Sequence, residues 1–340
     1  MDLLQKKELD TSRGFHYRYY VSSASDADSS KPAILLCHGW PDSADLWQYV
    51  IPQLLKTKNR LIVPDLLGAG GTSQPTDPAA FEIKGMVQDV QEILKAENIS
   101  QKIIPVGHDW GSYFAQRFYM LNGDRNAGVA TLNVAWMAPR GEPFDLDAFN
   151  DFTTKTVGYP VYAYWELFAD PKVGEVMDDK LESVWHAIHG DEDEWMKKIF
   201  CEHGEARKFI SANRTDVPLK PYAKDKKLHD SWIAEKKANG STSQCAWYRA
   251  LKEDYHLETE KTLNAKVTTP YLFIACDEDA VCRPDFINVG KQAGLFTDDQ
   301  LTVRELHSGH WCPYEKPDEV ADALLEWLRA NDFSAESSVP

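Results

Sequence analysis

The segment from Val106 to Ser112 has the residue types and spacing of a nucleophile presented on a sharp turn. It joins an apolar run of strand length to a helical pattern, and it places Asp109 between Gly107 and Gly111 in the small-x-nucleophile-x-small order of a nucleophile elbow. Glycines suit such a turn because a side chain would clash with the crowded backbone. The start of the following helix favours an anion. We therefore predict that Asp109 is a nucleophile, with a simple helix-capping role as the alternative.

A second segment, His38-Gly39-Trp40-Pro41, directly follows an apolar run that is predicted to be a strand. In a sheet that carries a nucleophile elbow, the loop at this place usually supplies one backbone N–H group to an oxyanion hole, and the residue after the nucleophile supplies the other. These two donors are predicted to be Trp40 and Trp110. A cis peptide bond before Pro41 is compatible with such a turn.

Two loops later in the chain contain an acid and a base. The first holds Asp277 and Asp279, and the second holds His307 and His310. Both loops follow predicted strands, and open parallel sheets build their sites at the carboxyl ends of strands. The order nucleophile, acid, histidine along the chain is that of the α/β-hydrolases. The residues by themselves leave the choice within each loop open.

The elements that must position these residues follow a βαβ rhythm, which predicts a parallel sheet between two layers of helices. Predicted strands cover 15–20, 33–37, 60–64, 102–107, 128–134, 270–275 and 301–306, and predicted helices cover 81–98, 113–121 and a last helix that starts at 317. One residue conflicts with this scheme. Pro105 lies inside a predicted strand, although proline is expected at sheet edges or bulges because it cannot donate to a ladder.

The alternation of predicted strands and helices stops in the middle of the chain. From about 139 to 263 the patterns are helical, with helices predicted over 176–188, 193–203 and 242–251. We therefore predict the α/β class: a mostly parallel central sheet flanked by helices, with an inserted helical cap. The core comprises residues 1–138 and 264–340, and the cap comprises residues 139–263.

Composition limits the partners. The chain has 37 Lys and Arg against 53 Asp and Glu, a formal net charge of −16, which argues against nucleic acid and against an anionic membrane surface. The first ten residues lack an apolar signal region, and none of the six cysteines forms a Cys-x-x-Cys pair, so a cytoplasmic protein with reduced thiols is expected. The 14 Phe, 14 Tyr and 11 Trp predict a core or pocket with aromatic walls.

Three of these segments, 38–41, 107–111 and 309–311, resemble the epoxide hydrolases of the α/β-hydrolase fold family, and the likeness runs from about 15 to 328. Ser112 departs from the family by replacing a more usual glycine. The resemblance implies that Asp279 rather than Asp277 is the acid and that His310 rather than His307 is the base.

The same family places two tyrosines in its cap. Segments 162–168 and 246–249 resemble the family's tyrosine segments and point to Tyr164 and Tyr248. Residues predicted to line the substrate pocket are His38, Pro41, Trp165, Trp247 and Trp311. The resemblance implies an apolar epoxide and water as the reaction partners, with no metal and no cofactor. His186 and His189 form a metal-like pair, but they lack the spacing and the Glu of a His-Glu-x-x-His site.

The implied reaction has two stages. Asp109 attacks an epoxide carbon to form an ester while Tyr164 and Tyr248 protonate the opening oxygen, and His310, oriented by Asp279, then activates the water that releases a vicinal diol. A haloalkane dehalogenase shares an Asp elbow followed by Trp, but a halide leaves without a proton. A serine esterase is excluded because residue 109 is Asp. A non-catalytic ligand-binding protein on the same fold is the alternative from another class.

Overall fold

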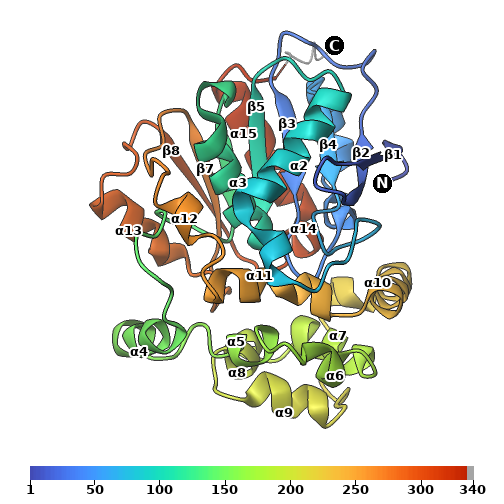
Figure 1. Cartoon of the computed structure of the whole chain (residues 1–340), viewed down its shortest axis with the longest axis vertical. Coiled ribbons are helices and arrows are strands. Elements are labelled where there is room, and N and C mark those ends of the chain that lie inside the picture. The colour runs from blue at the N-terminus through green and yellow to red at the C-terminus, as the bar shows by residue number, and fades with distance from the viewer. Residues whose placement is uncertain (335–340) are drawn as a thin grey trace.

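The computed structural model describes residues 1–334, and within them an eight-stranded sheet in the order β1-β2-β4-β3-β5-β6-β7-β8 (Figure 1). The strands are β1 (Gln5–Asp10), β2 (His16–Val21), β3 (Ala33–Cys37), β4 (Leu61–Pro64), β5 (Ile103–His108), β6 (Val129–Leu132), β7 (Tyr271–Cys276) and β8 (Leu301–Leu306). β1 pairs antiparallel with β2, and β2 with β4, whereas every later pair is parallel. The predicted α/β fold with a mostly parallel sheet is confirmed.

Helices account for most of the remaining regular structure in the described residues. The α-helices are α1 (Ile51–Leu54), α2 (Ile83–Ala96), α3 (Trp110–Asn122), α4 (Leu146–Val157), α5 (Trp165–Phe168), α6 (Val173–Met177), α7 (Leu181–His189), α8 (Trp195–Phe200), α9 (Glu205–Ser211), α10 (Lys226–Asn239), α11 (Thr242–Lys252), α12 (Leu257–Glu260), α13 (Ile287–Gln292), α14 (Cys312–Glu315) and α15 (Pro317–Ala330). The 3-10 helices are η1 (Ala44–Trp47), η2 (Leu55–Thr57), η3 (Pro78–Phe81), η4 (Gly123–Arg125), η5 (Pro221–Lys224) and η6 (Pro284–Phe286).

The sheet forms the middle layer, with α2 and α3 on one face and α15 on the other (Figure 1). α2 shows why these helices pack there, because Met86, Val90, Ile93 and Leu94 recur at helical spacing and are all buried. The strands between the two helical layers have apolar side chains on both faces. Every residue of β3, β5 and β7 is buried, as expected for parallel strands covered on both sides.

Pro105 lies in the central strand β5 and not at an edge, so the strand predicted over 102–107 is present despite the missing N–H group of the proline. It stands opposite Leu35 in the β3–β5 register. On the other side of β5, the registered pairs with β6 begin only at Val106. The proline therefore occupies the position just before the second ladder starts.

The sequence patterns missed β1 and misplaced several helix ends. β1 is an edge strand that pairs with β2 alone, and four of its six residues are charged, so it carries no apolar alternation. The helix predicted over 113–121 begins earlier, at Trp110, directly after the turn. The helix predicted over 176–188 is two helices, α6 and α7. The helix α10 was not predicted, because few of its residues are buried and its sequence shows little apolar periodicity. In the predicted second core segment, residues 335–340 lie outside the described residues.

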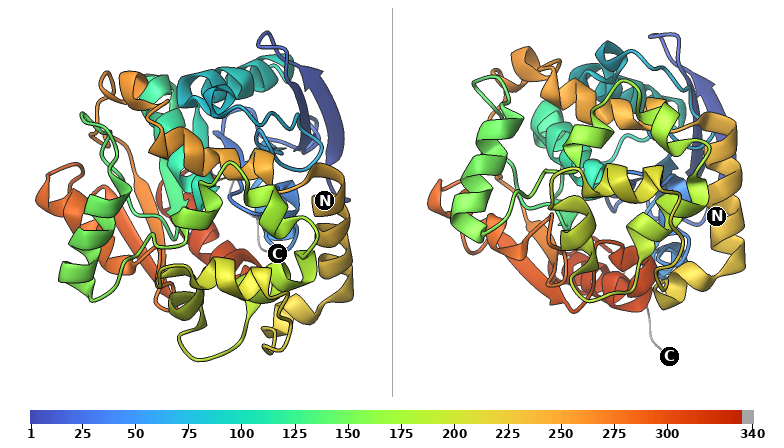
Figure 2. Two further views of the ribbon diagram at one scale, coloured as in Figure 1. Left: turned by 60° about the horizontal axis from the view of Figure 1, so that its bottom comes forward. Right: turned by 90° about the horizontal axis from the view of Figure 1, so that it is seen from below.

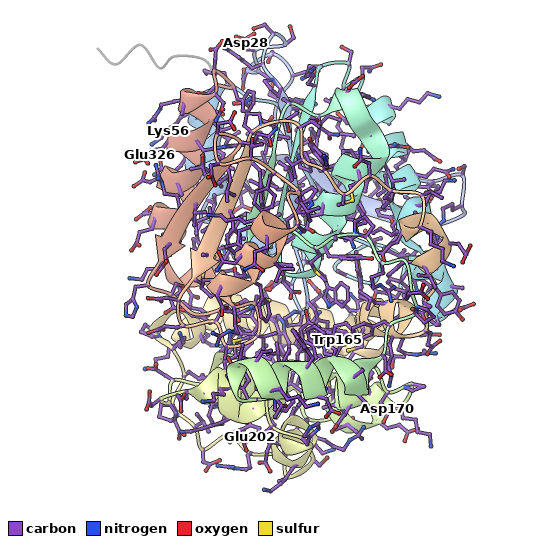
Figure 3. All side chains as sticks on the ribbon, turned by 90° about the vertical axis from the view of Figure 1, so that its left-hand side faces the viewer. Asp28, Lys56, Trp165, Asp170, Glu202 and Glu326 are labelled. Atoms are coloured by element: carbon purple, nitrogen blue, oxygen red, sulfur yellow. The ribbon has the colours of Figure 1, made fainter. Side chains whose placement is uncertain are left out.

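The helices α4 to α11 gather at one end of the sheet (Figure 1), and a view from that end shows them in front of it (Figure 2). Two side chains of α11 attach this layer to the sheet loops. Gln244 Nε2 donates to the carbonyl of Asp42 at 2.7 Å, after β3, and Trp247 Nε1 donates to the carbonyl of Leu67 at 3.0 Å, after β4. Trp165 lies where the layer of helices α4 to α11 meets the layer that contains the sheet. Asp170 and Glu202 lie at the end of the helical layer that is farther from the sheet (Figure 3).

All six cysteines are free thiols, and Cys282 is the only one of them that is not fully buried. Among residues 1–334, every helix is too short or too polar to cross a bilayer.

Candidate active site

Asp109 stands on a strained turn between β5, which ends at His108, and α3, which begins at Trp110. Its φ of 55° and ψ of −125° lie in a region that non-glycine residues rarely adopt, at a typical cost of about 1–3 kcal/mol. Its side chain makes no capping hydrogen bond to the helix, so the capping alternative is contradicted. The carboxylate is left free to face the cavity instead.

The turn is possible only because its neighbours are glycines. A Cβ atom on Gly107 would collide with the backbone of Gly111, and one on Gly111 would collide with the backbone of Cys37 at the end of β3. A Cβ atom on Gly39 would collide with Asp109 itself. The three glycines therefore allow two strand ends and one helix start to meet at the carboxylate.

Two groups from different loops approach the two oxygens of the Asp109 carboxylate. The backbone N–H of Trp40 donates to Oδ1 at 2.8 Å. His310 Nε2 lies 3.6 Å from Oδ2. The peptide bond between Trp40 and Pro41 is cis. Trp110, the second predicted N–H donor, is the first residue of α3.

His310 is paired with a buried carboxylate on the side away from Asp109. Its Nδ1 lies 2.7 Å from Asp279 Oδ2, which also accepts a hydrogen bond from Asn133 Nδ2 at 2.8 Å. Asp279 Oδ1 accepts from the backbone N–H groups of Val281 and Cys282. Burial opposes ionisation of Asp279, but the charge of His310 and these hydrogen bonds outweigh it and hold its pKa below the usual value.

Burial also favours the neutral form of His310, yet its pKa lies well above the usual value because the carboxylates of Asp279 and Asp109 flank the ring. The alternative acid and histidine of the same two loops lie away from Asp109. His307 is exposed and pairs with Asp277 at 3.1 Å, so neither residue reaches Asp109. The geometry brings together the pair that the resemblance implied.

Tyr164, the residue before α5, and Tyr248 of α11 face each other. Their ring centroids lie 5.8 Å apart at 84°, and both rings line a small cavity together with Asp109 and His310. Burial and the charge of Asp109 raise the pKa of Tyr164 well above its usual value, and burial, Tyr164 and Asp109 do the same for Tyr248. Both phenols are thus protonated at neutral pH.

The other tyrosines considered in the sequence make different contacts. Tyr162 stacks on Trp165 with centroids 4.8 Å apart, and the hydroxyl of Tyr159 donates to the carbonyl of Ala280. Tyr255 is exposed.

Two of the five predicted pocket residues line the cavities at Asp109. Trp165 lines one of about 90 Å³, and Trp311 lines a smaller one of about 20 Å³. His38, Pro41 and Trp247 line neither of these two cavities, so their predicted substrate contacts are not found there. The His38 ring instead contacts backbone groups. Its Nε2 accepts a hydrogen bond from the N–H of Leu66, and its Nδ1 lies 2.9 Å from the carbonyl oxygen of Gly39. Burial lowers the pKa of His38 to about 4.

Two supporting residues were missed by sequence reasoning. Asn133 follows β6 with a φ of 66° and holds Asp279, and its place at the carboxyl end of a predicted strand was the available signal. His108 Nε2 lies 2.7 Å from the carbonyl oxygen of His310, and burial lowers the pKa of His108 to about 4, so the neutral ring can donate to that carbonyl. His108 lies in the segment 107–111 that carries the resemblance, but no local pattern predicts its contact, because its partner is 202 residues away.

The site includes one group of residues with metal-ligating atoms. Asp279, Cys282 and His310 place such atoms within 4.8 Å of one another. Both oxygens of Asp279 already accept hydrogen bonds, one of them shared with the His310 ring. The group therefore fits an acid–base pair better than a metal centre. His186 and His189 instead contact the carbonyl of Val217 and the hydroxyl of Tyr222.

The chain matches the alpha/beta hydrolase fold family over residues 32–317 and belongs to that family. Bifunctional epoxide hydrolase 2 of Rattus norvegicus is 24% identical over 301 residues, which are 88% of this chain and 52% of that relative. The chain thus spans about half the length of the mammalian relatives it matches. Epoxide hydrolase A of Mycobacterium tuberculosis is 29% identical over 305 residues, 87% of this chain and 90% of the relative.

Solved structures agree with the fold. The crystal structure of epoxide hydrolase A from Mycobacterium thermoresistibile superposes with a TM-score of 0.76 at 25% sequence identity, and the match covers 96% of this chain and 98% of the other.

Proposed function

We propose that the protein is an epoxide hydrolase that converts apolar or aryl epoxides to vicinal diols. The observation that carries the proposal is the placement of two protonated phenols, the half-buried Tyr164 and the buried Tyr248, on the same small cavity as the Asp109 carboxylate and His310. The names of the relatives support the same activity. A cavity with aromatic walls and few charges suits an apolar substrate.

In the first stage, a carboxylate oxygen of Asp109 forms a bond to one epoxide carbon, and the strained carbon–oxygen bond breaks. The electron pair goes to the departing oxygen, which is too basic to leave as a free alkoxide. Tyr164 or Tyr248 donates its proton to that oxygen, and the other phenol donates a hydrogen bond. The products of this stage are an ester on Asp109 and a hydroxyl group on the neighbouring carbon.

In the second stage, His310 removes a proton from water, and the water oxygen attacks the carboxyl carbon of Asp109. Esterification has by then removed the negative charge of Asp109, which is one of the two charges that raise the pKa of His310. The ring is therefore a readier proton acceptor in the ester than in the free protein. The proton it gains returns through solvent to the tyrosine that lost one.

The tetrahedral intermediate carries a negative oxygen that needs hydrogen-bond donors. The N–H of Trp40 already lies on Asp109 Oδ1, and the N–H of Trp110 at the start of α3 is the second proposed donor. Each such donor is typically worth about 3 kcal/mol. Collapse of the intermediate breaks the ester, releases the diol and restores the Asp109 carboxylate.

The tyrosine pair also separates this proposal from a haloalkane dehalogenase. A halide leaves without a proton, so two phenols aimed at the leaving group would have no chemical role. A panel of aryl epoxides and chloroalkanes tests the choice by measuring diol and halide. Diol from the epoxides supports the proposal, and halide release without diol would reverse it.

Single turnover in heavy-oxygen water tests the covalent stage. Label is expected in the peptide that contains Asp109, because water attacks the carboxyl carbon. If the label appears only in the diol, water attacks the epoxide directly and the ester scheme is wrong.

A further inference from the structure

A buried carboxylate, Glu260, lies where the chain passes between the sheet layer and the helices α4 to α11, and the proposed reaction does not use it. The chain leaves the sheet layer after β6 through residues 137–144, and it returns through residues 253–260 after α11. Only 1% of Glu260 is exposed to solvent. Because a buried charge is costly unless it is paired, the partners of this carboxylate show what it holds together.

The two oxygens of Glu260 bind different parts of the molecule. Oε1 accepts hydrogen bonds from the hydroxyl of Tyr113 at 2.8 Å and from Nε and Nη2 of Arg117 at 3.0 and 2.6 Å, and both residues belong to α3. Oε2 accepts from the backbone N–H and the Nε of Arg140 at 3.2 and 2.9 Å, in the outgoing segment. One side chain therefore joins the outgoing segment, the returning segment and the helix that begins at the elbow.

Further contacts tie the same segments together beside the end of α11. Arg140 Nη1 and the backbone N–H of Phe144 both donate to Asp254 Oδ1 at 2.8 Å, and Asp254 follows the last residue of α11 by two positions. From α3, Arg117 Nη1 donates to the carbonyl of Met137 at 2.8 Å. These contacts hold the carboxyl end of α11 in a fixed position relative to α3.

The helix α11 carries Tyr248, one of the two proposed proton donors, and lies between the sheet layer and the helices α5 to α9 (Figure 1). The Tyr248 ring contacts Trp110 with centroids 5.0 Å apart at 88°, and the Trp110 ring contacts Tyr113 with centroids 5.6 Å apart. Tyr113 is the residue whose hydroxyl binds Glu260. Glu260 is thus connected to Tyr248 in two ways, through the end of α11 and through these rings.

The charges of this cluster balance, because the arginines Arg117 and Arg140 face the acids Glu260 and Asp254. Burial opposes ionisation of Glu260, but the charge of Arg117 and the hydrogen bonds hold its pKa below the usual value. The carboxylate is therefore ionised at neutral pH. Removal of its charge would leave the buried guanidinium of Arg117 uncompensated, which strongly disfavours the present packing of the three segments.

We propose that Glu260 is a positioning residue, which holds α11 on α3 so that the Tyr248 hydroxyl faces the oxygen of the opening epoxide. This role rests on the proposed epoxide hydrolysis. Ring opening needs the phenol on α11, whereas ester hydrolysis uses His310 and Asp279 in loops that follow β8 and β7. Loss of the Glu260 contacts should therefore slow the first stage and spare the second.

Glu260→Gln tests this role, because it keeps the size of the side chain and removes its charge. The appearance and decay of the ester on Asp109 are followed by rapid quenching and mass spectrometry during single turnover of an aryl epoxide. We expect ester formation to slow by about tenfold, the lower end of the loss expected when the Tyr248 hydroxyl is removed. Ester hydrolysis should change by less than about twofold.

A double-variant cycle distinguishes positioning of Tyr248 from a general loosening of the protein. If Glu260 acts through the Tyr248 hydroxyl, Glu260→Gln should slow ester formation by less than about twofold when it is added to Tyr248→Phe. General loosening would slow ester formation by the same factor in both backgrounds and would also slow ester hydrolysis. Either of these two results would overturn the inference.

Glu97→Gln is the matched control, because only 5% of the Glu97 side chain is exposed and it also binds two cations and a tyrosine. Its partners are Lys7 of β1, Tyr19 of β2 and Arg60 directly before β4, all within the sheet layer. The urea midpoint of this variant should fall, as expected for a broken ion-pair cluster. Both stages of the reaction should stay within about twofold of the unchanged protein.

Asp254→Asn provides the test if Glu260→Gln does not fold. The Asp254 side chain is 26% exposed, and asparagine tolerates its φ of 62°. Ester formation should slow by about two- to fivefold, as for a partly exposed ion pair, again with hydrolysis unchanged. Equal slowing of the two stages, or no slowing of ester formation, would overturn the inference. If the unchanged protein forms neither ester nor diol, the proposed function fails and the role of Glu260 fails with it.

Discussion

The carboxylate of Asp109 and the imidazole of His310 face each other with 3.6 Å between Oδ2 and Nε2, although 201 positions separate them in the chain. His310 is held on its other side by Asp279 at 2.7 Å. The ring thus lies between two carboxylates, one of which becomes neutral when it forms an ester. This relationship makes the two stages of the proposed reaction separable by mutation.

Substitution of His310 by Gln should stop the reaction after the first stage. Asp109 can still attack the epoxide, but no base activates water, so ester hydrolysis should slow by about 10³-fold or more. Mass spectrometry of the intact protein should then show an adduct equal in mass to the epoxide. The double variant Asp109→Asn, His310→Gln is the control and should show none. Absence of an adduct in the single variant would contradict the order of the stages.

Loss of either phenol should slow ring opening and leave ester hydrolysis less affected. Tyr164→Phe and Tyr248→Phe each remove one hydroxyl while keeping the ring, and each should reduce the single-turnover rate of ester formation by about 10–100-fold. The double variant should be slower than either. Tyr255→Phe, at an exposed tyrosine, should match the unchanged protein. Normal rates in the double variant would remove the tyrosines from the mechanism.

The pKa of His310 gives a prediction about pH. Asp279 is the strongest influence that raises it, so Asp279→Asn should lower the pKa of His310. Protonated His310 cannot act as a base, and the acid limb of ester hydrolysis should therefore move to lower pH in the variant. The maximal rate should also fall, by up to about 10⁴-fold, because the ring loses its orienting partner. An acid limb at unchanged pH would show that another group controls it.

A buried histidine away from the reaction centre should make the fold sensitive to acid. Burial lowers the pKa of His256 to about 3, and its Nδ1 accepts the N–H of Ile83. Below about pH 6.5 the unfolded chain therefore binds a proton at His256 that the folded state does not bind. The free energy of unfolding falls as the pH falls through that range, at about 1.4 kcal/mol per pH unit.

His256→Asn keeps an acceptor near Ile83 but cannot titrate. Urea unfolding at pH 7, 6 and 5 should show a smaller loss of unfolding free energy in this variant than in the unchanged protein. Equal losses in the two proteins would mean that His256 is not protonated on unfolding.

The glycines of the elbow should be needed for stability as well as for the site. Gly107→Ala places a Cβ atom against the backbone of Gly111, and overpacking of this kind typically costs about 1–3 kcal/mol. Gly141 has open space around it and a φ that other residues tolerate, so Gly141→Ala is the matched control and should change unfolding free energy by less than about 0.5 kcal/mol. Denaturant unfolding distinguishes the two, and equal midpoints would contradict the packing argument.

Much of this molecule follows from local sequence. The elbow around Asp109, the parallel strands and the helical segment after β6 were all predictable, because each depends on residues close together in the chain. A buried strand must be continuously apolar, and a tight turn must have glycines wherever backbones meet. The edge strand β1 was not predictable in this way, since its polar residues bury little surface.

The composition of the site beyond these motifs was decided by tertiary structure. Sequence alone left Asp277 and Asp279 equivalent, and only the fold places one of them against His310 while the other lies with exposed His307. It likewise assigned His38 and Trp247 to the pocket, whereas the fold uses both for hydrogen bonds to backbone. The roles of Asn133 and His108 were also decided by the fold. Each contacts a partner more than 100 residues away in the chain, and no local pattern encodes such a contact.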